Sequence, residues 1–207
     1  RVVQEYKNQG DRLMTTVRIN RFVPLALLLL PAIYLCSISA LQAQTDLPAG
    51  KRWTPLFNGE DLTGWNIAGQ EKWDVVNGEL AGESGPHGEY GYLFTEESYT
   101  DFELYLEFKL EGGGNSGVFF RSVLDGKRIS GWQVEVAPPG EGTGCIYETH
   151  GRGWLTEPDD GDALIPGDWN RMHLRVAGGN VTTWLNGKKI TKLKDEKIET
   201  GRGVIAL

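Results

Sequence analysis

Cysteine is scarce in this chain, which has only Cys36 and Cys145. Cys36 lies in an apolar segment that we expect to be removed, so the remaining cysteine cannot form an internal disulfide. The fold must therefore depend on its hydrophobic core alone. Cys145 stands in Gly-Cys-Ile at the start of a predicted strand, which favours a buried structural thiol over a nucleophile.

Positive charge is also in short supply, with 21 lysines and arginines against 28 aspartates and glutamates and a net charge of -7. Nothing in the sequence forms the basic stripe that binds phosphates, so we expect no nucleic-acid partner. Helical periodicity is equally rare, whereas glycine (28) and tryptophan (7) are abundant. This composition is typical of a single all-β domain rich in turns.

One long hydrophobic run spans residues 22–40, after Arg18 and Arg21. Together with the small residues around Ala40 and Ala43, it predicts a signal peptide over residues 14–43 that begins at Met14. We therefore expect residues 1–13 to lie upstream of the natural start and residues 44–52 to be a short leader. The mature protein would be secreted or periplasmic.

Two alternatives stay open for this segment. An uncleaved run of this length could serve as a membrane anchor, in which case it would be the protein's one contact with a membrane. A lipoprotein attached through Cys36 ranks lower, because Ile33-Tyr34-Leu35 has no small residue before the cysteine.

Strict alternation marks three segments in the middle of the chain, 101–110, 115–121 and 131–136. Phe102, Leu104 and Leu106 share one face of the first, which is the period of a half-buried strand. We predict three neighbouring antiparallel strands in a sheet that packs on a second sheet. Arg121 and Glu135 would share the polar face, which is either solvated surface or the floor of a binding site.

Turn chemistry divides the rest of the chain from residue 53 onward. Asn77-Gly78 and Asn186-Gly187 each separate two strand-like runs and predict type I′ hairpins. The segment 203–207 resembles a strand that the chain does not finish. We therefore predict one domain over residues 53–207, a two-sheet sandwich that is incomplete at its C-terminal end.

Several motifs together resemble the bacterial 3-keto-disaccharide hydrolase domain family, formerly a domain of unknown function. The most specific is Gly-Asn-Ser-Gly-Val-Phe-Phe-Arg at 114–121; the others are Pro-Leu-Phe-Asn-Gly at 55–59, Gly-Tyr-Leu-Phe-Thr at 91–95, Gly-Trp-Gln-Val-Glu at 131–135 and Trp-Leu-Asn-Gly at 184–187. The resemblance covers about 53–207. It implies a concanavalin A-like jelly roll that acts outside the cytoplasm on glycosides oxidised at C3.

The sequence departs from this family in two places. Many members have glutamate where this chain has Gln133 and glutamine where it has Glu135. The family also usually continues beyond Leu207 with a His-Gly pair and an Arg-Asn-Ile strand, so part of the sheet and of the site could be missing.

A ketone at C3 acidifies the C2 proton, so a base that removes it can expel the group on C1, and water can then add back. We assign Glu135 as the base and Arg121 as the cation that stabilises the enolate oxygen. His150 or Tyr147 would protonate the leaving oxygen. The residues expected to bind the sugar are Asn115, Gln133, Arg152 and Trp154.

Each of these residues also has a purely structural interpretation. Arg121 and Glu135 could form a cross-strand ion pair, Asn115 could belong to a turn, and His150 could be incidental surface. We expect His87 and His173 to lie on the surface. The acidic loop of Glu157, Asp159, Asp160 and Asp162 fits no EF-hand spacing; we expect no cofactor, and a divalent-metal requirement stays open.

Three functions compete at this stage. The first is cleavage of 3-keto-glycosides, by hydrolysis or by a lyase reaction, and the second is a carbohydrate-binding sandwich without catalysis. The third is a retaining β-glucanase, which needs closely spaced paired carboxylates. Glu103 and Glu107 come nearest to that pattern but lack its full motif, so this function ranks last.

Overall fold

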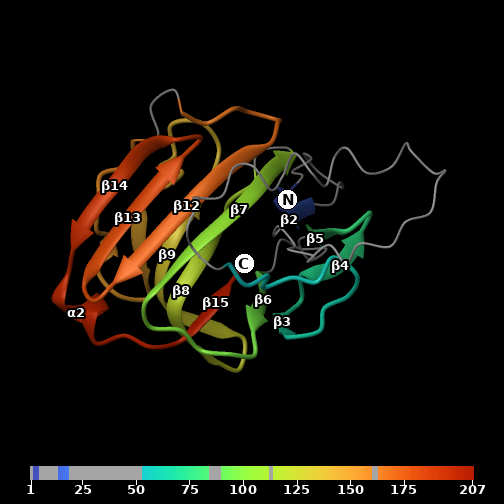
Figure 1. Cartoon of the computed structure of the whole chain (residues 1–207), viewed down its shortest axis with the longest axis horizontal. Coiled ribbons are helices and arrows are strands. Elements are labelled where there is room, and N and C mark those ends of the chain that lie inside the picture. The colour runs from blue at the N-terminus through green and yellow to red at the C-terminus, as the bar shows by residue number, and fades with distance from the viewer. Residues whose placement is uncertain (1, 5–13, 19–52, 84–89, 112–113, 160–162) are drawn as a thin grey trace, which may run out of the picture.

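The computed structural model describes residues 2–4, 14–18, 53–83, 90–111, 114–159 and 163–207. Within these ranges the chain forms two mainly antiparallel β-sheets that stack as two layers (Figure 1). The one helix among the described residues is the single turn α2, Glu196–Glu199. The predicted all-β jelly-roll sandwich is confirmed.

The first layer is an eight-stranded sheet with the order β1-β5-β2-β7-β12-β13-β14, in which β4 also pairs with β5. Its strands are β1 (Val2–Gln4), β2 (Met14–Arg18), β4 (Lys72–Val76), β5 (Glu79–Glu83), β7 (Phe102–Glu111), β12 (Asn170–Ala177), β13 (Asn180–Leu185) and β14 (Lys188–Lys194).

The second layer is a seven-stranded sheet with the order β11-β10-β9-β8-β15-β6-β3. Its strands are β3 (Trp65–Gly69), β6 (Gly91–Thr95), β8 (Ser116–Asp125), β9 (Arg128–Val136), β10 (Ile146–Thr149), β11 (Gly153–Trp154) and β15 (Val204–Ala206). The strand predicted over 203–207 is β15, and it pairs with β8 on one side and β6 on the other.

The core lies between the two layers and follows the predicted alternation. Leu104, Leu106 and Phe108 of β7 are buried together with Phe120 of β8 and Val134 of β9. One expectation was wrong, because β7 does not neighbour β8: it pairs with β12 in the other sheet. The apolar faces of β7 and β8 meet across the core. Alternation alone cannot distinguish two strands packed face to face from two strands paired edge to edge in one sheet.

Both predicted Asn-Gly hairpins are confirmed. Asn77 and Gly78 have φ values of 53° and 78°, and Asn186 and Gly187 have values of 49° and 84°. Positive φ at both central residues is the signature of a type I′ turn, whose twist matches that of the strands it joins.

Strands β1 and β2 were not predicted. They pair with β5 and β7, although the sequence placed their residues before and at the start of a signal peptide. The apolar run of that segment lies outside the described residues. Among the helical residues that the structure describes, none forms a helix with the length and apolar content needed to cross a membrane.

Two smaller expectations can be compared with the structure. Cys145 is buried as predicted, and its thiol donates to the carbonyl oxygen of Glu157 at 3.1 Å. His173 is not plain surface: its ring stacks between Tyr105 and Trp184, with centroid distances of 4.0 and 4.3 Å. His87 lies outside the described residues.

Candidate functional site

The register of the seven-stranded sheet aligns one row of side chains across all of its strands. From edge to edge the row contains Asn66, Phe94, Ala206, Phe119, Gln133, Tyr147 and Trp154. Directly opposed residues of antiparallel strands point to the same side. Since the alternating residues Val118 and Val134 face the core, this row lies on the opposite side of the sheet, which we call the outer face.

The outer face has two chemically different halves. The polar half contains Asn115, Gln133, Glu135, Tyr147 and Trp154. The apolar half is a cluster separate from the main core, formed by Tyr92, Phe94, Phe119, Leu124, Ile129, Val204 and Ala206. Glu135 lies opposite Gly117, two residues along the strands from the pair of Phe119 and Gln133 in the row described above.

Glu135 is the most unusual side chain of the polar half, because it is a carboxyl group with only 3% of its surface exposed. Asn115 Nδ2 donates to its Oε1, and Gln133 Nε2 donates to its Oε2 at 2.9 Å. Burial raises the pKa of Glu135 to about 7, although both amide hydrogen bonds oppose the rise. A carboxyl group with a pKa near neutrality is suited to accept and return a proton.

The specific motif at 114–121 explains how these groups come together. Asn115 lies just before β8, and Gly117 lies opposite Glu135 on the neighbouring strand. A Cβ atom at Gly117 would lie 2.6 Å from Gln133 Oε1, closer than such contacts allow. Glycine at 117 therefore leaves the space through which Gln133 reaches the carboxylate. The structure brings together Asn115, Gln133 and Glu135 as predicted.

Arg121 does not join them, and its predicted role beside the enolate is wrong. A register shift between Phe120 and Val123, with a φ of 48° at Arg121, ends the regular alternation of β8. The guanidinium is buried and donates to the carbonyl oxygens of Thr100, Gly178 and Ile198.

Arg121 also forms an ion pair with Asp101 at 2.7 Å. Its position along β8 is four residues from Gly117, or about 13 Å from the level of Glu135. Among the described residues, the hydrogen-bond partners of Arg121 and those of Glu135 do not overlap. Burial lowers the pKa of Arg121, although the Asp101 carboxylate opposes this shift. Arg121 thus connects loops at one end of the sandwich.

Tyr147 and Trp154 complete the polar half on the side of β10 and β11. Tyr147 lies opposite Gln133 and is half-buried, whereas Trp154 is 42% exposed. Their rings meet edge to face with a centroid distance of 5.3 Å. An exposed indole beside a phenol and two amides is a suitable surface for a sugar ring, which has both apolar and polar faces.

His150 and Arg152 lie away from this group. His150 is exposed in the turn after β10. The last residue of β10, Thr149, pairs with Gly131, which lies four residues and about 13 Å along β9 from Glu135. The structure therefore does not bring His150 to the base, and Tyr147 is the acid candidate that remains.

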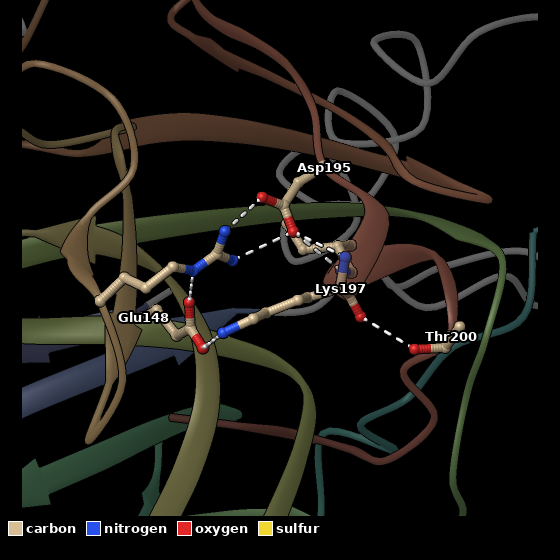
Figure 2. A network of polar contacts seen from close by, with 6 residues as sticks. Glu148, Asp195, Lys197 and Thr200 are labelled. Atoms are coloured by element: carbon tan, nitrogen blue, oxygen red, sulfur yellow. Dashed lines mark hydrogen bonds and ion pairs between the residues drawn. The ribbon is translucent and has the colours of Figure 1, made fainter.

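Arg152 is engaged in a network of charges rather than free for a sugar. Its guanidinium donates to Glu148 and to both carboxylate oxygens of Asp195, at 2.7 and 3.0 Å (Figure 2). The Asp195 and Glu148 hydrogen bonds raise the pKa of Arg152. Asp195 is also the N-cap of α2, so this network joins β10 to the helix.

Two features in or beside this sheet were not predicted from the sequence. The apolar half of the outer face was hidden because Tyr92 and Phe94 alternate within a strand of only five residues, in which the apolar Leu93 lies on the other face. Glu71 is a second carboxyl group whose pKa burial raises to about 7. It packs against Gly91 at the start of β6, and no motif marked it.

Metal binding has no obvious site in the part of the chain described. Within those residues, no three histidine, cysteine, aspartate or glutamate side chains gather as ligands. Asp160 and Asp162 of the acidic loop lie outside them.

Comparison with known proteins gives a consistent family assignment. Residues 52–207 match the model of the family described as the 3-keto-alpha-glucoside-1,2-lyase-like domain. A curated relative named 3-keto-disaccharide hydrolase, from Bacteroides thetaiotaomicron, is 31% identical over 74 residues, which are 31% of this chain and 26% of the relative. The match thus spans about a quarter of that relative's length.

Two crystal structures from Parabacteroides distasonis have the same fold, and both proteins carry a provisional description as glycosyl hydrolases. The first is 20% identical and covers 74% of this chain and 85% of its own, with a TM-score of 0.50. The second is 24% identical and covers 75% and 90%, again with a TM-score of 0.50. At these identities the likeness extends to the fold alone.

Proposed function

Because the chain belongs to the family of 3-keto-alpha-glucoside-1,2-lyase-like domains, we propose that it cleaves 3-keto-glycosides with Glu135 as the base. The observation that supports this most is the buried Glu135 carboxyl group, held by two amide donors and with a pKa of about 7. The family description and the name of the Bacteroides relative support the substrate class.

The reaction begins with removal of the C2 proton. The Glu135 carboxylate takes this proton, and the electrons of the C2–H bond form an enolate with the C3 ketone. When the enolate collapses, a double bond forms between C1 and C2 and the C1–oxygen bond breaks. The leaving oxygen takes a proton from Tyr147 or from water. A lyase reaction ends here with an unsaturated 3-keto sugar.

Hydrolysis needs one further step. Water adds its oxygen to C1 and gives one proton to the base left by the previous step, which is the Tyr147 phenolate or hydroxide. The proton held by Glu135 returns to C2, which restores both side chains and gives the free 3-keto sugar. An amide nitrogen carries two hydrogens, and Asn115 and Gln133 each use one on Glu135. The second hydrogen of each amide is the donor we assign to the enolate oxygen and its neighbouring hydroxyl, in place of Arg121.

The test is replacement of the base with its uncharged isostere. Glu135→Gln should reduce turnover of 3-keto-glucosides by at least 10³-fold, and exchange of the C2 hydrogen with deuterated solvent should disappear with it. Glu96→Gln, an exposed carboxyl group beyond β6, is the matched control and should retain both. Retained C2 exchange in Glu135→Gln would contradict the assignment.

A carbohydrate-binding sandwich without catalysis is the second candidate, and the exposed Trp154 beside Tyr147 favours it. Titration calorimetry separates the two. Sugar binding retained in Glu135→Gln, with turnover lost, supports the enzyme. Binding by the parent protein with no turnover of any 3-keto-glycoside supports the binding module.

A further inference from the structure

The apolar half of the outer face has no part in the chemistry described above, yet it adjoins the site directly. Phe119 is the strand neighbour of Gln133, and its ring meets that of Tyr92 edge to face with a centroid distance of 5.5 Å. Ala206 lies opposite both Phe119 and Phe94. A second apolar cluster on the side of the sheet away from the core is not required to hold the two layers together.

The dimensions of the sheet indicate what could lie across it. Neighbouring strands are about 4.8 Å apart, so Phe119 is one strand from Gln133 and the β6 aromatics are about three strands away. Trp154 is about two strands from Gln133 on the other side. Measured across the strands, Glu135 therefore stands between two aromatic surfaces. One is about 10 Å away at Trp154, and the other begins about 5 Å away at Phe119 and extends to about 14 Å at β6.

The two surfaces differ in chemistry. Around Tyr147 and Trp154 the neighbours are amides and a carboxyl group, which suit the hydroxyls of the oxidised sugar. Around Tyr92 and Phe119 the packed neighbours are Phe94, Val204 and Ala206. The nearby polar groups, Asn66 opposite Phe94 and the Glu71 carboxyl beside Tyr92, lie toward the β3 edge of the sheet. A polar sugar on this side would leave the hydroxyls that face Phe119, Val204 and Ala206 unpaired, and unpaired buried hydroxyls are costly.

We infer that the apolar half is the subsite for the group that leaves C1, and that it selects an aglycone with an apolar ring over a small polar one. This inference rests on the proposed function. It assigns the oxidised ring to Tyr147 and Trp154, the C2 proton to Glu135, and the aglycone to the partly exposed Tyr92. Phe119 is only 6% exposed and supports the Tyr92 ring edge to face. Tyr92 thus becomes a specificity-determining residue of the cleavage reaction.

The experiment compares kcat/KM for the cyclohexyl and methyl 3-keto-glucosides, in one anomeric form. Both leaving groups are alkoxides of similar basicity, so a difference between them reports contact with the ring rather than intrinsic reactivity. The parent protein should prefer the cyclohexyl substrate about tenfold or more, as expected for burial of several methylene groups. Tyr92→Ala should reduce this preference to less than about threefold, because it lowers kcat/KM for the cyclohexyl substrate much more than for the methyl substrate.

Three further variants identify other causes. Tyr92→Phe keeps the ring and should keep the preference. Trp154→Ala should lower kcat/KM for both substrates equally, because the ring that Trp154 contacts is common to them. Ile67→Ala removes an exposed side chain beside Ala68, which lies opposite Tyr92, and should change neither substrate.

The outcomes that overturn the inference are distinct from failure of the function. If Tyr92→Ala lowers both substrates equally, or if the parent protein cleaves both with equal kcat/KM, the aglycone does not lie on the apolar half, while the proposed reaction stands. If the parent protein cleaves neither substrate, nor any other 3-keto-glycoside, the proposed function fails and this inference fails with it.

Discussion

The carboxyl group of Glu135 has two amide donors and almost no exposed surface, and these conditions act on its pKa in opposite directions. Hydrogen bonds from Asn115 and Gln133 stabilise the charged form, whereas burial destabilises it. Burial is the larger effect, and the pKa is about 7. The consequence is a base whose charged and neutral forms lie close in free energy near neutral pH, so that it can both take and return a proton.

The pH dependence of turnover should follow this group. A base must be deprotonated to act, so kcat/KM for a 3-keto-glucoside should rise with pH, reach half its maximum near pH 7 and level off above. A series of rate measurements from pH 5 to pH 9 checks this. A midpoint near 4.5, the ordinary value for glutamate, would show that the base is exposed in the working enzyme.

Stability should vary in the opposite sense. Because the pKa of Glu135 is higher in the folded protein than in the unfolded chain, the folded state binds the extra proton between the two values. The free energy of unfolding should therefore decrease as pH rises from about 4.5 to about 7, by up to ~3 kcal/mol from this group. Urea unfolding at pH 5 and pH 7.5 should show a smaller decrease for Glu135→Gln than for the parent, and equal decreases would contradict the assignment.

Gly117 offers a test of how the base is positioned. In Gly117→Ala the new Cβ would lie 2.6 Å from Gln133 Oε1, so Gln133 must move and its hydrogen bond to Glu135 is lost. We expect kcat to fall about tenfold or more with a loss of ~1–2 kcal/mol in stability. Kinetics and urea unfolding on one preparation measure both. Gly126→Ala, at an exposed turn with open space around it but a φ of 59°, is the comparison variant. It should lose some stability through backbone strain but leave kcat unchanged.

At the scale of strands and loops, Arg121 shows how a site motif can contain a structural residue. Its guanidinium joins three segments of the chain through the carbonyl oxygens of Thr100, Gly178 and Ile198. Carbonyls at loop ends need partners when they are buried. A single cation that supplies them fixes the middle of β8, at its register shift, against turns outside its own sheet.

The two engaged arginines should therefore differ sharply on substitution. Arg121→Met leaves three carbonyl oxygens without this donor and should cost ~3 kcal/mol. Arg152→Met removes contacts with Glu148 and Asp195 at a partly exposed site and should cost ~1 kcal/mol or less. Urea unfolding of both variants measures the difference. If Arg121→Met remains folded, the pH midpoint of its turnover should equal that of the parent protein. Loss of activity without loss of stability would instead indicate a catalytic role for Arg121.

Much of the arrangement was predictable from local patterns. Alternation located β7, β8 and β9, and the Asn-Gly pairs located two hairpins, because these signals depend on neighbouring residues. The sheet to which a strand belongs does not depend on neighbouring residues, so β7 was assigned to the wrong layer. In the site, Asn115, Gln133 and Glu135 follow the regular alternation and were brought together as expected. The predicted placement of Arg121 in the site was wrong because the register shift after Phe120 turns its side chain off that face. The predicted placement of His150 was wrong because its turn lies beyond the far end of β10.

At the scale of the whole molecule, the first strands raise a question of processing. We propose that residues 14–43 act as a signal peptide and that the protein is secreted or periplasmic, as the charge and apolar pattern of that segment indicates. Mass spectrometry of the protein from its natural source should then find a first residue at or near Gln44. Peptides that cover Val2 to Arg12 would contradict the proposal. Removal of this segment would leave β5 and β7 without the partners β1 and β2.

The short helix α2 and its N-cap accept hydrogen bonds from two arginines of the seven-stranded layer, Arg121 and Arg152. Arg121 donates to the carbonyl oxygen of Ile198, and Arg152 donates to the carboxylate of Asp195, the N-cap of α2. The single turn α2 is therefore a shared point of attachment for β8 and for the turn after β10. A protease cut at this turn should loosen β8 and β10 simultaneously, and amide exchange in both strands would then accelerate by the same factor.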